Sequence, residues 1–198
     1  MQGLVNRAIQ CFVRDNYGWS LWEQVVRRAE LGFSSFEAML DYDPVITGQL
    51  CTALEAVLNK PLEILLEDLG TYLVSHSTTS ALRRLLRFGG ANFEDFLLSL
   101  DDLPEKARFA LPDVDLPKLH CKHVNKTQFM LLVSPGLPGF GAVMVGVLRA
   151  MADDYGALVF LEREVEENQD VIRITLADAA FAKGRGFNLA ASVGAVHA

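Results

Sequence analysis

The sequence predicts an α+β fold in which a run of helices precedes an antiparallel sheet of about four strands with one inserted helix. Apolar residues recur every three or four positions up to about residue 103, which is the period of amphipathic helices. The period changes to two over residues 120–134 and again over 157–165 and 171–176. A run of helices followed by a run of strands is typical of the α+β class.

The composition limits the class of protein further. The chain has 198 residues, of which 51% are hydrophobic and 22% charged, as expected of one globular domain. The net charge of −7 argues against nucleic-acid binding, which needs a basic surface, and suits a cytoplasmic protein. The three cysteines include no CxxC pair, so a disulfide framework or zinc site is not expected. Neither a signal peptide nor a membrane span is expected, because no apolar run approaches the ~20 residues that a span needs.

Five helices are expected before residue 90, over about 4–13, 20–28, 46–58, 62–73 and 81–88. Pro61 should open the fourth at a first-turn position, where its missing N–H costs nothing. The fifth helix is short and basic. Its arginines should form a solvated face, or alternatively meet an acidic partner or a ligand carboxylate; they are Arg83, Arg84 and Arg87.

The segment from Asn92 to Pro104 is the middle of the predicted fold. Asn92 is a capping residue, and the apolar residues that follow it form one stripe on a helix. Pro104 falls where the stripe still continues, so the helix should end or kink there. The stripe is either plain core or the lining of a cavity. Its members are Phe93, Phe96, Leu97, Leu100 and Leu103.

Pro112 and Pro117 bracket an extended connector that leads into the first strand pair. A strong helix is expected from Phe140 to Met151, followed by a hairpin that turns across residues 166–170. These elements divide the domain, residues 1–176, into a helical lobe of about 1–90 and a helix/sheet lobe of about 91–176. Residues 177–198 are rich in small side chains and are expected to form a loosely held tail.

Several short segments resemble the H-NOX, or haem nitric oxide/oxygen binding (HNOB), family, which includes the sensor domain of soluble guanylate cyclase. The opening residues 1–6, the triplet Asn16-Tyr17-Gly18 and the pair Trp22-Glu23 are similar to the start of an H-NOX domain. The order of elements up to about residue 176 also resembles that fold. Residues 96–103 resemble the family helix that carries the proximal histidine, the haem iron ligand.

The resemblance implies a set of haem-pocket positions. Pro104 occupies the position of the family's proximal histidine. Pro117 occupies the position of a family proline that presses on the porphyrin. In the family's YxSxR motif, Leu132 replaces the tyrosine and Gly136 replaces the arginine, whereas the serine is retained as Ser134. The candidate cofactor-binding positions are Phe93, Phe96, Leu97, Leu100, Pro104, Pro117, Leu132, Ser134 and Gly136.

These replacements predict that conventional haem ligation is lost. In the family the motif tyrosine and arginine hold the haem propionates, and a glycine supplies no charge-assisted bond. Haem iron takes an axial His, Cys, Met or Tyr, and proline offers no donor. The alternative iron ligands are His120, Cys121 and His123, which are expected to be exposed strand or loop residues, and His76, which is expected to be a loop or helix-cap residue. Cys11 and Cys51 are expected to be core thiols.

Two functions remain open. The first is a non-enzymatic sensor or signalling domain without conventional haem, whose pocket is filled by side chains or by another apolar ligand. It would act through a separately encoded signalling protein, since no output domain is expected after residue 176. The second is a haem-dependent NO or O2 sensor with a non-standard iron ligand or none. An enzyme is not expected, because no nucleophile–base pair, metal cluster or phosphate loop is evident.

Overall fold

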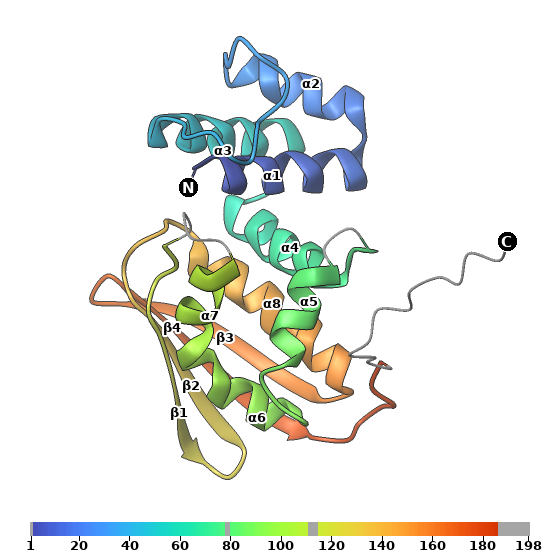
Figure 1. Ribbon diagram of the computed structural model, residues 1–198, viewed down its shortest axis with the longest axis vertical. Coiled ribbons are helices and arrows are strands. Elements are labelled where there is room, and N and C mark those ends of the chain that lie inside the picture. Colours follow the sequence, from blue (N-terminus) through green and yellow to red (C-terminus); the bar gives the residue numbers. More distant parts are fainter. Residues whose placement is uncertain (1, 78–79, 111–114, 186–198) are drawn as a thin grey trace, which may run out of the picture.

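The computed structural model describes residues 2–77, 80–110 and 115–185 (Figure 1). The five helices predicted before residue 90 are confirmed. They are α1 (Gln2–Tyr17), α2 (Trp19–Arg28), α3 (Pro44–Leu58), α4 (Leu62–Ser75) and α5 (Ser80–Arg87). Pro61 is the N-cap of α4, one position before the predicted first turn. Pro112 of the predicted connector lies outside the described residues.

The second half contains the predicted sheet and its inserted helix. Three short helical segments come first, namely α6 (Phe93–Leu98), the 3-10 helix η2 (Ser99–Asp102) and α7 (Leu103–Ala110). Strands β1 (Leu119–Asn125) and β2 (Gln128–Val133) follow, then α8 (Phe140–Tyr155), β3 (Leu158–Glu166) and β4 (Gln169–Asp178). The strand order is β1-β2-β4-β3, and every neighbouring pair is antiparallel. The α+β class is therefore confirmed.

The β3–β4 hairpin turns more tightly than the sequence predicted. Its strands pair as far as Glu166 and Gln169, so only Glu167 and Asn168 form the loop. Both have positive φ, 48° and 66°, as the two central residues of a type I′ turn require. The five-residue loop predicted over 166–170 is thus wrong, because Asn168 accepts a left-handed conformation and the strands extend further.

Two apolar clusters form the interior. One belongs to the N-terminal helices and centres on Trp22, Phe36 and Leu50. The other lies between one face of the sheet and the helices α6 and α8, and it also receives Val74 of α4 and Leu86 of α5. Helix α4 extends from the first cluster to the second, as the teal helix in Figure 1 shows.

Helices α4 and α8 join the two clusters through a glycine contact. A Cβ atom on Gly70 would lie 2.0 Å from the carbonyl oxygen of Val143, and one on Gly146 would lie 1.9 Å from that of Glu67. Any side chain at either position would therefore force the helices apart. The Thr71 hydroxyl donates to the Gly146 carbonyl at 3.3 Å, which adds a polar contact at the same place.

The chain after β4 returns to the end of α8. The Ala182 amide donates to the Gly156 carbonyl at 3.0 Å, and the Arg185 amide donates to the Asp154 carbonyl at 2.9 Å. Residues 186–198 of the predicted tail lie outside the described residues. Across the part of the chain that the structure describes, no helix has both the length and the apolar character that crossing a bilayer requires.

Candidate functional site

The candidate site begins at α6, and its capping matches the sequence prediction. The Asn92 side chain accepts a hydrogen bond from the Asp95 amide at 2.9 Å. The helix narrows to 3-10 form over Ser99–Asp102, where the Leu103 amide donates to the Leu100 carbonyl. An α-helical bond to that carbonyl would need an N–H on Pro104, which proline lacks. The predicted kink is therefore present, but it lies before the proline, which becomes the second residue of α7.

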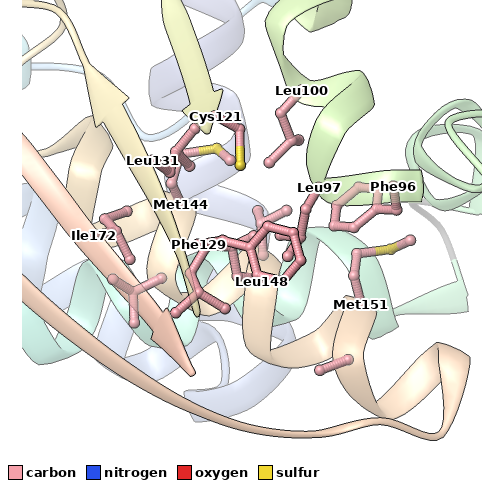
Figure 2. Packing of buried hydrophobic residues seen from close by; sticks show 14 of the residues in the cluster. Phe96, Leu97, Leu100, Cys121, Phe129, Leu131, Met144, Leu148, Met151 and Ile172 are labelled. Atoms are coloured by element: carbon pink, nitrogen blue, oxygen red, sulfur yellow. The ribbon is translucent and has the colours of Figure 1, made fainter. Parts of the chain in front are cut away.

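The apolar stripe of α6 points into the sheet-lobe core. Phe93, Phe96, Leu97 and Leu100 are each at most 2% exposed. Figure 2 shows the last three of these facing the inner side of the sheet and helix α8, with side chains from all three sources directed toward one another. Their neighbours there are Phe129, Leu131, Met144, Leu148, Met151 and Ile172.

The other candidate positions are partly brought together. Pro104 and Pro117 are buried, and a Cβ on Gly136 would lie 3.2 Å from the Pro117 ring, so these last two positions are adjacent. The Ser134 amide donates to the Lys118 carbonyl at 2.9 Å, which ties it to the connector. Leu132 is separate: its neighbours Leu131 and Val133 face the core, so its own side chain is on the opposite face of the sheet.

An arginine–carboxylate cluster lies beside the end of β2. Asp170 is the register partner of Val133, the residue before Ser134. Its carboxylate accepts from the Arg163 guanidinium, which also donates to Glu63 of α4 at 2.5 Å. Gly141, near the start of α8, leaves the space that the Asp170 carboxylate occupies. Burial, the largest single influence, lowers the pKa of Arg163, but the hydrogen bonds and charges of Glu63 and Asp170 together raise it above its usual value. This arginine is committed to protein carboxylates.

The alternative iron ligands do not converge. His76 is at the C-terminus of α4, whereas His120 and His123 are exposed on β1. Asp101 of η2 engages two of the candidates: one carboxylate oxygen is 2.7 Å from His120 Nδ1, and the other accepts from the Cys121 amide at 2.6 Å. Within the described residues, no group of three or more His, Cys, Asp or Glu side chains could hold a metal ion.

Cys121 differs from the expectation. It is 6% exposed and faces the core, because alternate residues of β1 point inward. Burial, with a smaller contribution from Asp101, raises the pKa of its thiol to about 12. The prediction that it is an exposed strand residue is therefore wrong. Cys11 and Cys51, which were expected in the core, are only half-buried.

The basic helix α5 is also not a simple solvated face. Arg83 Nε donates to Asp154 Oδ1 at 2.8 Å, and Arg87 Nε is 3.6 Å from the other carboxylate oxygen. The Asp154 side chain is only 1% exposed. The Arg87 guanidinium also lies 3.9 Å from the centre of the Tyr155 ring. Two of the three arginines thus contact a carboxylate, but this carboxylate is Asp154 of the same chain and not that of a partner or ligand. The third, Arg84, is exposed.

Solved structures define the class of fold. A mutant Fe(II) unliganded H-NOX protein from K. algicida superimposes with a TM-score of 0.76 at 16% identity, covering 90% of this chain and 97% of that one. A mutant H-NOX protein from S. oneidensis in the Fe(II) ligation state gives 0.75 at 14% identity, with coverage of 90% and 97%. The fold is that of an H-NOX domain.

The sequence comparisons identify the family. The Haem-NO-binding (HNOB) model matches residues 2–162, so the chain belongs to that family. Soluble guanylate cyclase gcy-31 of Caenorhabditis elegans is 26% identical over 154 residues, which are 78% of this chain and 22% of that protein. Soluble guanylate cyclase 89Db of Drosophila melanogaster is 20% identical over 171 residues, or 86% and 26%. The chain spans about a quarter of the length of these curated relatives.

Proposed function

We propose that this chain is a non-enzymatic sensor or signalling domain of the H-NOX family that works without a bond between haem iron and a protein side chain. The proposed domain comprises residues 1–176, with the lobes at about 1–90 and 91–176. Its output would pass to a separately encoded signalling protein, in a cytoplasmic setting that the acidic composition suits. The observation that carries this proposal is the burial of Pro104 in the first turn of α7.

The chemistry around Pro104 supports the proposal. Haem iron takes an axial His, Cys, Met or Tyr. In the described helical segment 93–110, the side chains next to Pro104 are those of Leu103 and Glu105, and no residue of that segment is one of those four types. His76, His120 and His123 are exposed or half-buried on other elements, and Cys121, which faces the core, has a thiol whose pKa is raised by burial to about 12. The residues at this position therefore do not fit a conventionally ligated haem.

The surroundings of Ser134 support it as well. Propionates are well held by an arginine fork. Gly136 offers only backbone, and the Leu132 side chain is on the sheet face away from the α6 stripe. The arginine beside the end of β2, Arg163, already binds Asp170 and Glu63. A haem carboxylate would have to displace one of those partners.

Packing supports the filled-pocket form of the proposal. Phe96, Leu97 and Leu100 interlock with α8 and the inner face of the sheet. Protein interiors of this kind leave few voids larger than a water molecule. Since haem would need these side chains to move apart, its binding would have to offset the loss of core packing. An apolar small ligand would face the same cost.

Haem reconstitution tests the proposal. The full chain, expressed with supplemented haem and then titrated with haemin, should show no stoichiometric Soret band and no five- or six-coordinate iron spectrum. Pro104→His should still bind little haem, because Leu132 and Gly136 leave the propionates without their family contacts. The three substitutions His76→Ala, His120→Ala and His123→Ala are the matched controls for a substitute ligand.

The second candidate, a haem-dependent sensor with an unusual ligand, predicts the opposite spectrum. A stoichiometric Soret band that one of those three alanine substitutions abolishes would establish it and overturn our proposal. A stable five-coordinate haem in the Pro104→His variant would show that one side chain, rather than the packed core, limits haem binding.

A further inference from the structure

The four-stranded sheet has two faces, of which one belongs to the sheet-lobe core. Helices α6 and α8 pack on this inner face, against side chains such as Leu131 and Ile172. Because successive side chains of a strand alternate between the faces, the intervening residues form the opposite, outer face. The outer face comprises His120 and Lys122 of β1, the even-numbered residues of β2 and β3, and the odd-numbered residues of β4. The outer residues of both edge strands, β1 and β3, are exposed.

The strand register arranges the outer face in rows that run across the sheet from β1 to β3. One row consists of His120, Leu132, Val171 and Glu164, and the next consists of Lys122, Met130, Arg173 and Glu162. Beyond the first row, Lys118 precedes β1 and Glu166 ends β3, so these two residues extend the pattern by one row. Each row therefore begins with a basic residue at one edge of the sheet and ends with a glutamate at the other.

The charges at the two edges are not neutralised within one copy of the chain. In the part of the chain that the structure describes, Lys118, Lys122 and Glu162 form no ion pair. Arg173 binds the other two glutamates of β3, with its Nη2 2.8 Å from Glu166 Oε1. Three carboxylates against one guanidinium leave two negative charges at this edge, and the two lysines leave two positive charges at the other. Three strand spacings, about 14 Å, separate the edges, so these charges do not meet in one sheet.

We infer that the outer face is a self-association surface and that its occupant is a second copy of this chain. A two-fold axis parallel to the strands and midway between β2 and β4 keeps positions along the strands and exchanges the two edges. It therefore places β1 of each copy over β3 of the other. Lys122 then faces Glu162 of the second copy, the reverse pair forms as well, and the other rows match in the same way. Leu132 lies over Val171 at the centre, as in a face-to-face packing of two sheets.

Association through the outer face fits this sheet better than association through an edge. At the β1 edge, Asp101 already accepts from the Cys121 amide at 2.6 Å, so that backbone donor is taken. Edge-to-edge pairing of β3 with its copy would bring glutamates of like charge side by side, which is unfavourable. The face measures about 19 Å across four strands and about 20 Å along six residues, which is smaller than a standard interface. We therefore expect a weak dimer, whose formation is independent of haem and of the proposed function.

Sedimentation equilibrium of the full chain measures the association directly. Between about 10 µM and about 1 mM protein, the average mass should rise from that of a monomer toward that of a dimer, with a Kd on the order of 100 µM for so small an interface. About 150 mM NaCl screens the repulsion between two chains of net charge −7 beyond about 8 Å and leaves close pairs in place. In 1H–15N spectra, dilution should shift the amides of Lys122, Leu132 and Glu162 and leave those of α1, α2 and α3 unchanged.

Charge-reversal variants test which residues face each other. Lys122→Glu and Glu162→Lys should each weaken self-association at least about fivefold, because both contacts across the axis then bring like charges together. In an equimolar mixture of the two variants each reversed charge faces its opposite, so the heterodimer should form with a Kd within about twofold of the wild-type value. Arg84→Glu on α5 and Glu37→Lys before α3 are matched controls and should self-associate like the wild-type chain. All four residues are exposed, and circular dichroism checks that each variant is folded.

Three results would overturn the inference. One is a monomer at every concentration up to about 1 mM. Another is a dimer whose dilution shifts lie on α1, α2 and α3 rather than on the outer face. The third is a dimer that the reversals at Lys122 and Glu162 weaken no more than the controls do, or that their mixture fails to restore. Incorporation of haem would leave the inference intact, because the α6 stripe lies on the inner face of the sheet.

Discussion

The sheet-lobe core and the rings between α1 and α4 differ in the polarity of their surroundings. The second group consists of Phe12, Tyr17, Tyr72 and His76, which line a surface hollow. Around Phe96 the rings and aliphatic groups are fully enclosed by α8 and the sheet, and the buried cluster is apolar. Around Tyr72 the rings of Phe12 and Tyr72 are buried and that of Tyr17 is partly exposed. Asp15 accepts from the Tyr72 hydroxyl, and Asp68 lines the same hollow. The comparison shows that the rings between α1 and α4 have carboxylates as neighbours, whereas the stripe that resembles a haem helix packs only against apolar groups.

The N-terminal helices also contain buried side-chain oxygens that accept specific hydrogen bonds. Gln10 is fully buried, and its side-chain oxygen accepts from the Phe36 amide at 2.9 Å. The Asn6 oxygen accepts from the Thr47 hydroxyl at 2.9 Å. Such bonds fix the loop 29–43 and α3 on α1. The cluster around Phe96 is apolar, so stability there should depend more steeply on side-chain volume.

The largest expected effect is that of Phe96→Ala, which should lower the free energy of unfolding by about 3 to 5 kcal/mol, because it leaves a cavity in a filled core. Chemical denaturation followed by circular dichroism measures it. Tyr17→Ala, at the border of the hollow, is the matched aromatic control and should cost less than about 1 kcal/mol. Equal losses for the two variants would remove the distinction between the two aromatic clusters.

Removal of the buried ion pair at the end of α8 should cause the second-largest loss in the free energy of unfolding. Asp154→Ala should destabilise the protein by about 2 to 3 kcal/mol, since it leaves two arginines near a buried site without their carboxylate. Both arginines retain some exposure, 26% and 14%, so the loss should stay below that of a fully enclosed pair. Denaturant midpoints check this prediction, with Asp102→Ala, in an exposed i,i+4 pair, as the control.

Substitutions at the glycine contact between α4 and α8 should change the free energy of unfolding by a smaller amount, and the sign of the change can be predicted. Gly146→Ala should cost about 1 to 3 kcal/mol, because its methyl would collide with the Glu67 carbonyl and the two backbones must separate. Gly48→Ala, in the exposed part of α3 with open space around it, should instead stabilise by about 0.5 to 1 kcal/mol. Thermal melts of the two variants should shift in opposite directions.

The rates at which cysteine thiols are alkylated should differ between the sheet lobe and the N-terminal helices, and measuring them needs no substitution. With its pKa raised to about 12, Cys121 carries only about one thiolate in 10⁴ at pH 8. It should therefore resist iodoacetamide in the native protein and react only on unfolding, whereas half-buried Cys11 should react first. Mass spectrometry of timed samples locates the label. Equal native rates for the two cysteines would contradict the buried orientation of β1.

Local patterns predicted most of the fold. The 3.6-residue period located the N-terminal helices, and the change to a period of two located all four strands. Asn92 was recognised as a cap because capping chemistry involves residues only three apart. Pro104 correctly indicated an irregular helix, but the sequence could not place the kink. The position of the kink depends on which amide donates to the Leu100 carbonyl. In the 3-10 turn that donor is the amide of Leu103, the residue before the proline.

Contacts between distant residues were harder to predict. Arg83 and Asp154 are 71 residues apart, and nothing local distinguishes this arginine from exposed Arg84. The burial of Cys121 depended on which face of β1 meets α6 and η2. The rings that line the hollow come from α1 and α4. Tyr72 and His76 are four residues apart on α4, but their contacts with α1 join residues that are far apart in the sequence.

The sequence by itself determined the helices, the strands and the α+β class, because these follow from short-range periodicity. The haem-pocket positions come from the family resemblance and stay a prediction. The tertiary structure alone decided that the α6 stripe packs as core, that Arg83 and Arg87 meet Asp154, and that rings from α1 and α4 come together. The physical reason is that burial and charge pairing are set by which surfaces meet, and those surfaces come from segments far apart in the chain.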